Sequence, residues 1–134
     1  MPRFAFRDAS ALVKLTVHEP ETPALEGTVL GFDALFTSEV GAIELHRALG
    51  RTGVRAAAEQ AEDVLDAVFI ATLTPAIRGQ AGLLEPPSLR AFDAIQIATA
   101  ASLSLPDLTF ITYDDRQVAA ARAQGLRVLQ PGRD

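Results

Sequence analysis

Near its start the chain contains the segment Arg3-Phe4-Ala5-Phe6-Arg7-Asp8-Ala9-Ser10-Ala11-Leu12. Arg3–Arg7 is short and aromatic, which is typical of a β-strand, and apolar residues recur at helical spacing from Ser10 to Val17. A strand that passes almost directly into a helix is the unit of a parallel sheet, because parallel strands need a crossover connection. One acid, Asp8, stands at the junction between this predicted strand and helix.

The alternation of strand and helix continues to the end of the chain. Further strands are predicted at Ala34–Thr37, Val68–Leu73, Thr109–Thr112 and Arg127–Gln130. Helices are predicted at Ser10–Val17, Pro23–Leu30, Ser38–Leu49, Arg55–Ala67, Pro75–Leu84, Leu89–Leu103 (with Ser88 as its cap) and Asp115–Gln124. We expect an α/β fold, a three-layer α/β/α sandwich with a short, mostly parallel central sheet of about five strands. Residues 1–134 are expected to form a single domain whose last residues, 131–134, fray.

The composition excludes several classes of protein. The chain has no Cys and only two His residues, His18 and His46, which excludes disulfides, thiolate zinc sites and a site made of imidazoles alone. No stretch approaches the roughly 18 apolar residues of a membrane span, and no secretory signal is evident, so we expect a cytoplasmic protein with no membrane partner. The formal net charge of −5 disfavours a generic nucleic-acid coat, but it is compatible with a nuclease whose acids gather in one site.

Four acids stand where a solvated surface acid is not expected. Asp8 and Asp114 each follow a predicted strand, and the carboxyl ends of parallel strands border the binding crevice. Glu44 and Asp93 lie in apolar helical segments, where a carboxylate is costly to bury without a partner. Structural roles are the alternative: Asp8 and either Asp114 or Asp115 could cap helices, and buried Arg side chains could pair with the other two acids.

Convergence of these four carboxylates would call for a cation, because like charges raise one another's pKa. Oxygen ligands without Cys favour Mg²⁺ or Mn²⁺, and such ions serve phosphoryl chemistry. With the four acids set aside, thirteen acids remain against twelve bases. The negative charge would then be concentrated in one site instead of being spread over the surface.

Four segments in register resemble PIN-domain proteins, and VapC-type toxins in particular. They are Asp8-Ala9-Ser10-Ala11-Leu12-Val13-Lys14, Thr37-Ser38 through Glu44-Leu45-His46-Arg47-Ala48-Leu49, Leu89 through Ala100, and Phe110 through Arg116. The resemblance runs over nearly the whole chain. It implies a Mg²⁺- or Mn²⁺-dependent endoribonuclease that is the toxin of a type II toxin–antitoxin pair, forms a homodimer and binds a small cognate antitoxin protein. RNA is the implied substrate.

The resemblance also implies a set of site residues. The acidic site would comprise Asp8, Glu44, Asp93 and Asp114, with Asp8 and Asp93 as the principal metal ligands and the other two acids acting directly or through water. Ser10 and Thr112 match small hydroxyl positions that orient a carboxylate or water.

Two departures from the family pattern concern the ends of strands. Arg7 stands where an apolar strand residue is more usual, so it marks either an early strand end or a charge near the site. The tandem Asp114-Asp115 offers two candidates for the fourth acid. The Thr-x-Asp spacing favours Asp114, and we assign the capping role to Asp115.

Several other side chains near these motifs receive predictions of their own. Arg47, Arg51 and Arg116 are candidate RNA contacts, and each could instead be a solvated residue or the partner of a nearby Glu. Lys14 is expected to extend its ammonium group to water. Phe92 and Tyr113 are expected in the core and not as platforms for base stacking. The apolar residues Leu25, Val29, Leu30 and Phe32 could face either the core or an antitoxin helix.

The mechanism that we expect uses metal held by Asp8 and Asp93 to bind the scissile phosphate, while a water oriented by Glu44 or Asp114 attacks in line. It needs neither a His base nor the RNA 2′-hydroxyl group. A haloacid-dehalogenase-like phosphatase is a competing class, but it requires a second Asp where this chain has Ser10. A housekeeping RNA-processing nuclease of the PIN type and a catalytically inactive binding module remain alternatives.

Overall fold

The computed structural model of the chain describes residues 1–133 and contains one five-stranded parallel sheet. Its strands are β1 (Phe4–Arg7), β2 (Ala34–Ser38), β3 (Phe69–Ala71), β4 (Thr109–Ile111) and β5 (Arg127–Leu129). The strand order is β3-β2-β1-β4-β5, and every neighbouring pair is parallel. This confirms the predicted sheet. It also places β1 at the centre, so the carboxyl end of β1 lies between those of β2 and β4.

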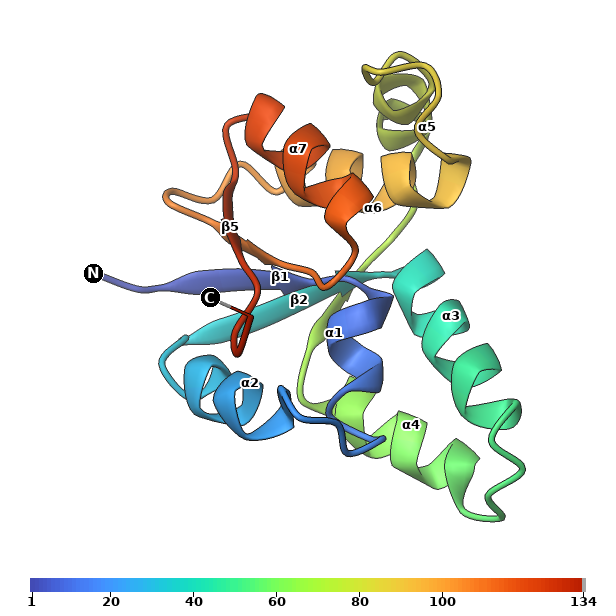
Figure 1. Cartoon of the computed structure of the whole chain (residues 1–134). Coiled ribbons are helices and arrows are strands. Elements are labelled where there is room, and N and C mark those ends of the chain that lie inside the picture. The colour runs from blue at the N-terminus through green and yellow to red at the C-terminus, as the bar shows by residue number, and fades with distance from the viewer. Residues whose placement is uncertain (134) are drawn as a thin grey trace.

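Helices cover both faces of the sheet (Figure 1). They are α1 (Ala9–Val13), α2 (Thr22–Val29), α3 (Glu39–Gly50), α4 (Ala57–Asp66), α5 (Pro75–Gly82), α6 (Ala91–Ser102) and α7 (Asp115–Ala123). Figure 1 shows α6 and α7 on one face and α1 and α2 on the other, with α3 and α4 beside α1. The predicted three-layer sandwich is therefore confirmed. Within residues 1–133, no helix combines the length and the apolar character needed to cross a bilayer.

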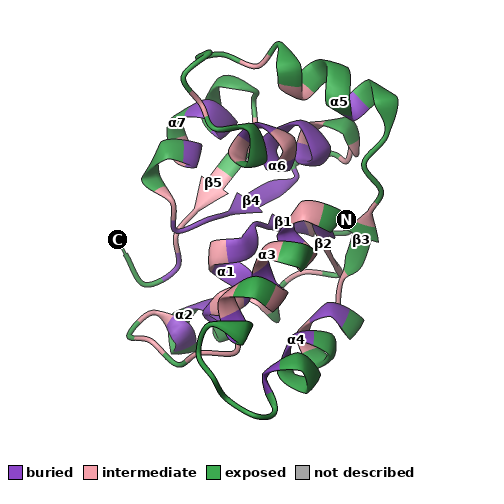
Figure 2. Cartoon of the chain, turned by 90° about the vertical axis from the view of Figure 1, so that its right-hand side faces the viewer, coloured by how far each residue is buried: buried purple, intermediate pink, exposed green. Residues whose placement is uncertain are grey.

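The core on the α6–α7 face is built from aromatic residues of the sheet and small residues of the helices. The rings of Phe6 on β1 and Phe110 on β4 stack with their centroids 5.4 Å apart. Ile97, Ala120 and Ala121 pack against these rings from α6 and α7. Figure 2 shows this buried layer along β4 and α6. Small alanines let the helices approach the sheet closely, which fixes where α6 and α7 begin relative to the strand ends.

The opposite face has two smaller clusters that meet at α1. Ala11 packs with Leu25 of α2 beneath the sheet, whereas Leu12 packs with Leu45 and Leu49 of α3. Of the apolar residues predicted to face either the core or a partner, Leu25 is fully buried, while Leu30 is 86% exposed. This set of apolar residues is therefore divided between the core and the surface.

The first helix is shorter than predicted. It ends at Val13 and not at Val17, because the backbone after it continues in hydrogen-bonded turns. The prediction for Lys14 is wrong for the same reason. This turn buries the Lys14 side chain, whose ammonium group pairs with the carboxylates of Glu19 and Glu21 instead of extending to water.

The start of the sixth helix also differs from the prediction, since α6 begins at Ala91 and not at Leu89. The N–H group of Leu89 donates to the carbonyl oxygen of Pro86 at 2.9 Å. Ser88 therefore lies in a turn before the helix and does not cap it, and Arg90 takes the N-cap position without a side-chain cap bond. The other element boundaries lie within two residues of their predicted positions.

The prediction of a frayed C-terminus is wrong for residues 131–133, and Asp134 lies outside the described residues. The Tyr113 hydroxyl donates to the Pro131 carbonyl oxygen at 2.8 Å. The Arg133 guanidinium donates in turn to the Tyr113 carbonyl oxygen at 2.8 Å and to the Glu21 carboxylate at 3.2 Å. These bonds hold the segment that follows β4, the segment in which Thr112 and Asp114 lie.

The N-terminus of α3 packs unusually closely against α6. Ser38 caps α3 by accepting from the Gly41 N–H at 2.9 Å, and its hydroxyl donates to Gln96 Oε1 on α6 at 2.7 Å. A Cβ atom on Gly41 would lie 2.5 Å from Thr37 Oγ1 and 3.0 Å from Gln96 Nε2. The close approach requires glycine, and it holds the following turn of α3, which carries Glu44, next to α6.

We expect Gly41→Ala to lower the free energy of unfolding by about 1–3 kcal/mol, because the added methyl group would clash with Thr37 of β2 and Gln96 of α6. Gly79→Ala is the matched control, since a Cβ atom there meets nothing within 4 Å on α5. That control should raise the free energy of unfolding by about 0.5–1 kcal/mol through helix propensity. Urea unfolding measures both changes, and equal effects of the two substitutions would contradict the close-packing argument.

Candidate active site

The carboxylate of Asp8 occupies the carboxyl end of the central strand. Asp8 is buried, and its Oδ1 caps α1 by accepting from the Ala11 N–H at 3.0 Å. The hydroxyl of Ser10 donates to Oδ1 and that of Thr112 to Oδ2, each at 2.6 Å. The capping role considered for Asp8 is thus present, and it occurs within a site where three donors meet one carboxylate.

The two hydroxyl groups also connect the segments that follow β1 and β4. The Tyr113 N–H donates to Ser10 Oγ at 2.9 Å, and the Asp114 N–H donates to Thr112 Oγ1 at 3.0 Å. Each hydroxyl therefore accepts from the backbone of the β4 segment while it donates to Asp8. The network holds Asp8 and the start of α7 in one arrangement.

Asp93 lies in the first turn of α6 and is held by a residue that the sequence analysis missed. Its Oδ1 accepts from Gln117 Nε2 on α7 at 2.8 Å. Its Oδ2 is buried and has no hydrogen-bond partner among residues 1–133. Asp114 and Gln117 have the spacing of a capping box, in which Gln117 would bond back to the helix start. In the structure this amide instead reaches across to Asp93.

Asp114, and not Asp115, caps α7. Its Oδ1 accepts from the Arg116 N–H at 3.0 Å. The Arg116 guanidinium binds the same carboxylate through two bonds of 3.1 and 3.2 Å. The capping role predicted for Asp115 is wrong, because its carboxylate accepts from Gln130 Nε2 instead. Arg116, a predicted RNA contact, is therefore paired with a predicted metal ligand.

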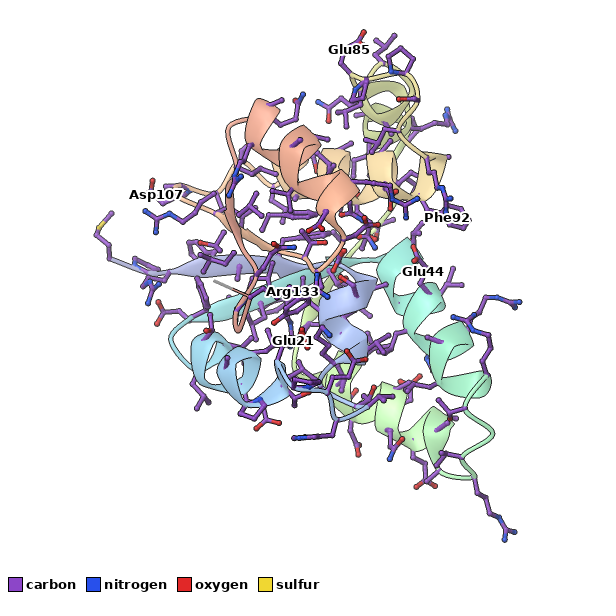
Figure 3. The ribbon with its side chains drawn as sticks, in the orientation of Figure 1. Glu21, Glu44, Glu85, Phe92, Asp107 and Arg133 are labelled. Atoms are coloured by element: carbon purple, nitrogen blue, oxygen red, sulfur yellow. The ribbon has the colours of Figure 1, made fainter. Side chains whose placement is uncertain are left out.

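Glu44 lies on α3, half-buried, where two clefts adjoin. One cleft is lined by Asp93, Asp114, Arg90 and Arg116, and the other by Ser10, Arg47 and Arg51. Glu44 and Phe92 line both clefts, and Figure 3 shows them near one another between α3 and α6. Phe92 is 59% exposed, so its prediction as a core residue is wrong, whereas Tyr113 is buried as predicted.

Burial and repulsion from neighbouring acids raise the pKa values of Asp8 and Glu44. Burial raises the pKa of Asp8 to about 6, although the hydrogen bonds from Ser10, Thr112 and Ala11 act in the opposite direction. The pKa of Glu44 is raised by burial and then by the charges of Asp8, Asp93 and Asp114. The charges of Asp8, Asp93 and Asp114 thus all act on Glu44.

Arg116 and Arg7 differ in how they affect the negative charge of the four acids. Burial raises the pKa of Asp114, but the hydrogen bonds and charge of Arg116 outweigh burial, so that the net pKa is lowered. Arg7, the last residue of β1, is buried, and burial lowers its pKa to about 10. Arg7 forms no ion pair with any carboxylate of the described chain, and its Nε has no hydrogen-bond partner there. It therefore does not neutralise Asp8 by direct contact.

The acids are not arranged as a ready-made metal cage. Within the described part of the chain, no three or more Asp, Glu or His side chains are grouped so that they could hold one ion. Asp8, Asp93 and Asp114 are each turned toward donors of the protein. The residues nevertheless fit a hard divalent cation, because Asp93 Oδ2 is buried with no hydrogen-bond partner in residues 1–133 and every candidate ligand is a carboxylate oxygen. Asp114 could join such a site only by exchanging Arg116 for the ion.

The PIN-domain family model matches residues 5–123. The chain belongs to the PIN-domain family, as its motifs predicted. Ribonuclease VapC47 of Mycobacterium tuberculosis (strain CDC 1551 / Oshkosh) is 37% identical over 132 residues, which cover 95% of this chain and 96% of the relative.

Solved structures share the fold. VapC20 of Mycobacterium tuberculosis, described as a Sarcin-Ricin loop cleaving toxin, superimposes with a TM-score of 0.71 at 20% identity, covering 87% of this chain and 94% of that one. A chain of a toxin–antitoxin complex from Klebsiella pneumoniae also gives 0.71, at 18% identity and 95% and 97% coverage. Together with the parallel sheet, these similarities confirm the predicted PIN-like fold.

We expect Asp8→Asn to stabilise the chain above about pH 6 by about 1–3 kcal/mol when metal is withheld by a chelator. The folded pKa of Asp8, about 6, lies above the ordinary value of 3.8. The folded state therefore holds more protons between these values, and stability falls as the pH rises through them. Asn avoids this loss and still caps α1.

The measurement is urea unfolding of wild type and variant at about pH 4.5 and about pH 7.5. The stability difference between the two proteins should be large at the higher pH and shrink at the lower pH. Asp115→Asn is the control, since Asp115 is exposed and lies outside the acidic site. A difference that stays constant with pH would show that burial of the Asp8 charge is not the cause.

Proposed function

We propose that this chain is a Mg²⁺- or Mn²⁺-dependent endoribonuclease and the toxin of a toxin–antitoxin pair, with residues 1–134 acting as one nuclease domain. The observation that carries the proposal is the gathering of four acids in a PIN fold: Glu44, Asp93 and Asp114 line one cleft, and Thr112 links Asp114 to Asp8 by hydrogen bonds. The buried Asp93 Oδ2, which has no hydrogen-bond partner among residues 1–133, adds to it. The similarity to ribonuclease VapC47 over nearly the whole chain supports RNA as the substrate.

Asp8 and Asp93 would hold the ion, and Glu44 and Asp114 would complete the site directly or through water. A bound Mg²⁺ or Mn²⁺ supplies neutralisation of phosphate oxygens and lowers the pKa of water. The protein's own contribution is orientation. Ser10 and Thr112 fix both oxygens of Asp8, and Gln117 positions Asp93.

Glu44 is the residue best suited to accept a proton from the attacking water. It is half-buried at the junction of the two clefts, and its pKa is raised toward the range in which a carboxylate acts as a general base. Neither His takes part in this scheme. His46 pairs with Glu62 at 3.0 Å, and neither His18 nor His46 lines either cleft.

Protein partners belong to the same proposal: a cognate antitoxin and a second copy of the chain. The fold is shared with a chain of the toxin–antitoxin complex from Klebsiella pneumoniae. Exposed apolar side chains on the edge strand β3 and near α5 support contact with another protein, because such groups favour burial. These side chains are Phe69, Ile70, Leu73 and Leu83.

We expect Asp93→Asn to lower the rate of RNA cleavage by about 100-fold or more, because the loss of a metal ligand weakens stabilisation of the transition state. Each tenfold loss of rate corresponds to only ~1.4 kcal/mol of that stabilisation. Asp114→Asn should also lower it. Asp115→Asn is the matched control and should retain the wild-type rate, since Asp115 contacts Gln130 and lines neither cleft. The assay is cleavage of RNA by purified protein with Mn²⁺, repeated with a chelator.

Two outcomes of that assay would contradict the proposal. Full activity in the presence of chelator would show that cleavage does not need a metal. Full activity of Asp93→Asn would show that the acidic site is not the active site. If Asp115→Asn loses activity while Asp114→Asn keeps it, the fourth acid is Asp115. Absence of cleavage together with Mn²⁺ binding by calorimetry would favour the inactive binding module.

We expect induced expression of the wild-type chain without its antitoxin to arrest growth of a bacterial host, whereas Asp93→Asn should not. Asp115→Asn should arrest growth as the wild type does, because its site is intact. Colony counts after induction measure the effect, and a neighbouring gene for a small antitoxin should relieve it on co-expression. A protein that cleaves RNA in vitro but leaves growth unchanged would be a housekeeping nuclease.

A further inference from the structure

Phe92 is exposed at the one place where the two clefts of the site adjoin. It follows the N-cap of α6 by two residues and immediately precedes Asp93, a candidate metal ligand. Scattered exposed apolar residues are ordinary on protein surfaces. Phe92 differs because it lines both clefts together with Glu44, which lies near it in Figure 3.

The two clefts adjoin at Glu44 and Phe92, and we call the two together the Phe92 groove. Its first lobe contains Ser10, Arg47 and Arg51, and its second contains Asp93, Asp114, Arg90 and Arg116. The lobes enclose about 420 Å³ and about 360 Å³, respectively. Each volume lies within the range of sites that hold small organic ligands, and a nucleotide unit is a ligand of that kind.

Positive charge lies in both lobes of this groove. Arg47 and Arg51 are one helical turn apart on α3 and are exposed, and Arg90 is exposed at the start of α6. None of these three forms an ion pair with a carboxylate among residues 1–133, so the alternative of pairing with a nearby Glu is wrong for Arg47 and Arg51. Exposed guanidinium groups that lack a carboxylate partner suit phosphate groups.

We propose that the Phe92 groove binds an unpaired stretch of RNA across both lobes, with one base stacked on the Phe92 ring beside the scissile phosphate. This inference rests on the proposed nuclease function and assigns Phe92 as a residue that positions the RNA in the site. Arg47 and Arg51 contact backbone phosphates in the first lobe, and Arg90 contacts them in the second lobe, beside Asp93 and Asp114. An aromatic face stacks on any base that is not already stacked within a duplex, and arginines follow the backbone.

The test uses Phe92→Trp, because the chain has no Trp of its own and the new indole reports only from this position. A single-stranded RNA of about eight nucleotides is titrated into this variant at low salt with a chelator present. We expect saturable quenching of the indole emission. Phe69→Trp is the matched control, because Phe69 is also an exposed Phe, 63% against 59%, and lines neither lobe.

A second measurement does not depend on the introduced indole. Phe92→Leu should weaken binding of the same labelled RNA by about 5- to 150-fold, and Phe92→Tyr should restore it, because the aromatic face is kept. The same strand annealed to its complement should quench the emission of Phe92→Trp much less, because its bases are already stacked. Because Phe92 is exposed, all variants should unfold at the wild-type urea concentration, which verifies that the fold is intact.

Three results would overturn the inference: no quenching in Phe92→Trp, equal quenching by the duplex, or binding by Phe92→Leu within about twofold of wild type. Cleavage of RNA with Mn²⁺ by the wild type is scored separately. Cleavage without quenching leaves the nuclease proposal standing and overturns the stacking. Quenching and weakened binding by Phe92→Leu, but without cleavage, support the stacking and contradict the nuclease.

Discussion

Burial of one carboxylate, that of Asp8, is the constraint on which the rest of the site depends. A buried negative charge is unstable without donors, and Asp8 receives three: a helix N-terminal N–H and two hydroxyl groups. One of those hydroxyls, on Thr112, comes from beyond β4, more than a hundred residues along the chain. The hydrogen bonds that stabilise the buried Asp8 carboxylate therefore also join the two halves of the sheet, at the edge where the proposed chemistry would occur.

Stability and function oppose one another at this residue. The donors lower the pKa of Asp8, yet burial outweighs them and leaves it at about 6, so the ionised form costs folding energy near neutral pH. A metal ion needs that same ionised form. The chain thus carries a destabilising charge that the proposed cation would compensate. Asp93 Oδ2, which is buried and has no hydrogen-bond partner among residues 1–133, repeats the arrangement on α6.

The architecture could be predicted from the sequence because it depends on periodicity. Five short strands alternate with helical patterns, and a buried parallel sheet is the one arrangement that satisfies them. The errors occur where a backbone turn or a side-chain contact competes with that pattern. Ser88 lies in a turn made by Leu89 and Pro86, and the turn after Val13 buries Lys14 beside two carboxylates. Neither contact has a local signature in the sequence.

The acids of the site were foreseeable, whereas their neighbours were not. Asp8 and Asp114 follow strands, and an acid in an apolar helix such as Asp93 is conspicuous in any sequence. Gln117 has the spacing of a capping residue, and only the packing of α7 against α6 turns its amide toward Asp93. Phe92 lies in a helix that is apolar on nearly every side, so periodicity assigns it no face. Its side chain lies at the surface, beside the two clefts.

The same geometry resolves the conflict between an acidic chain and a polyanionic substrate. Arg47 and Arg51 line the first lobe of the Phe92 groove, Arg90 lines the second lobe beside Asp93 and Asp114, and Glu44 lines both. Under the proposed function, phosphates in the first lobe would meet guanidinium groups, and a phosphate in the second lobe would also face carboxylates. Repulsion would then fall mainly on the phosphate beside the acids, which is where a divalent ion would be needed.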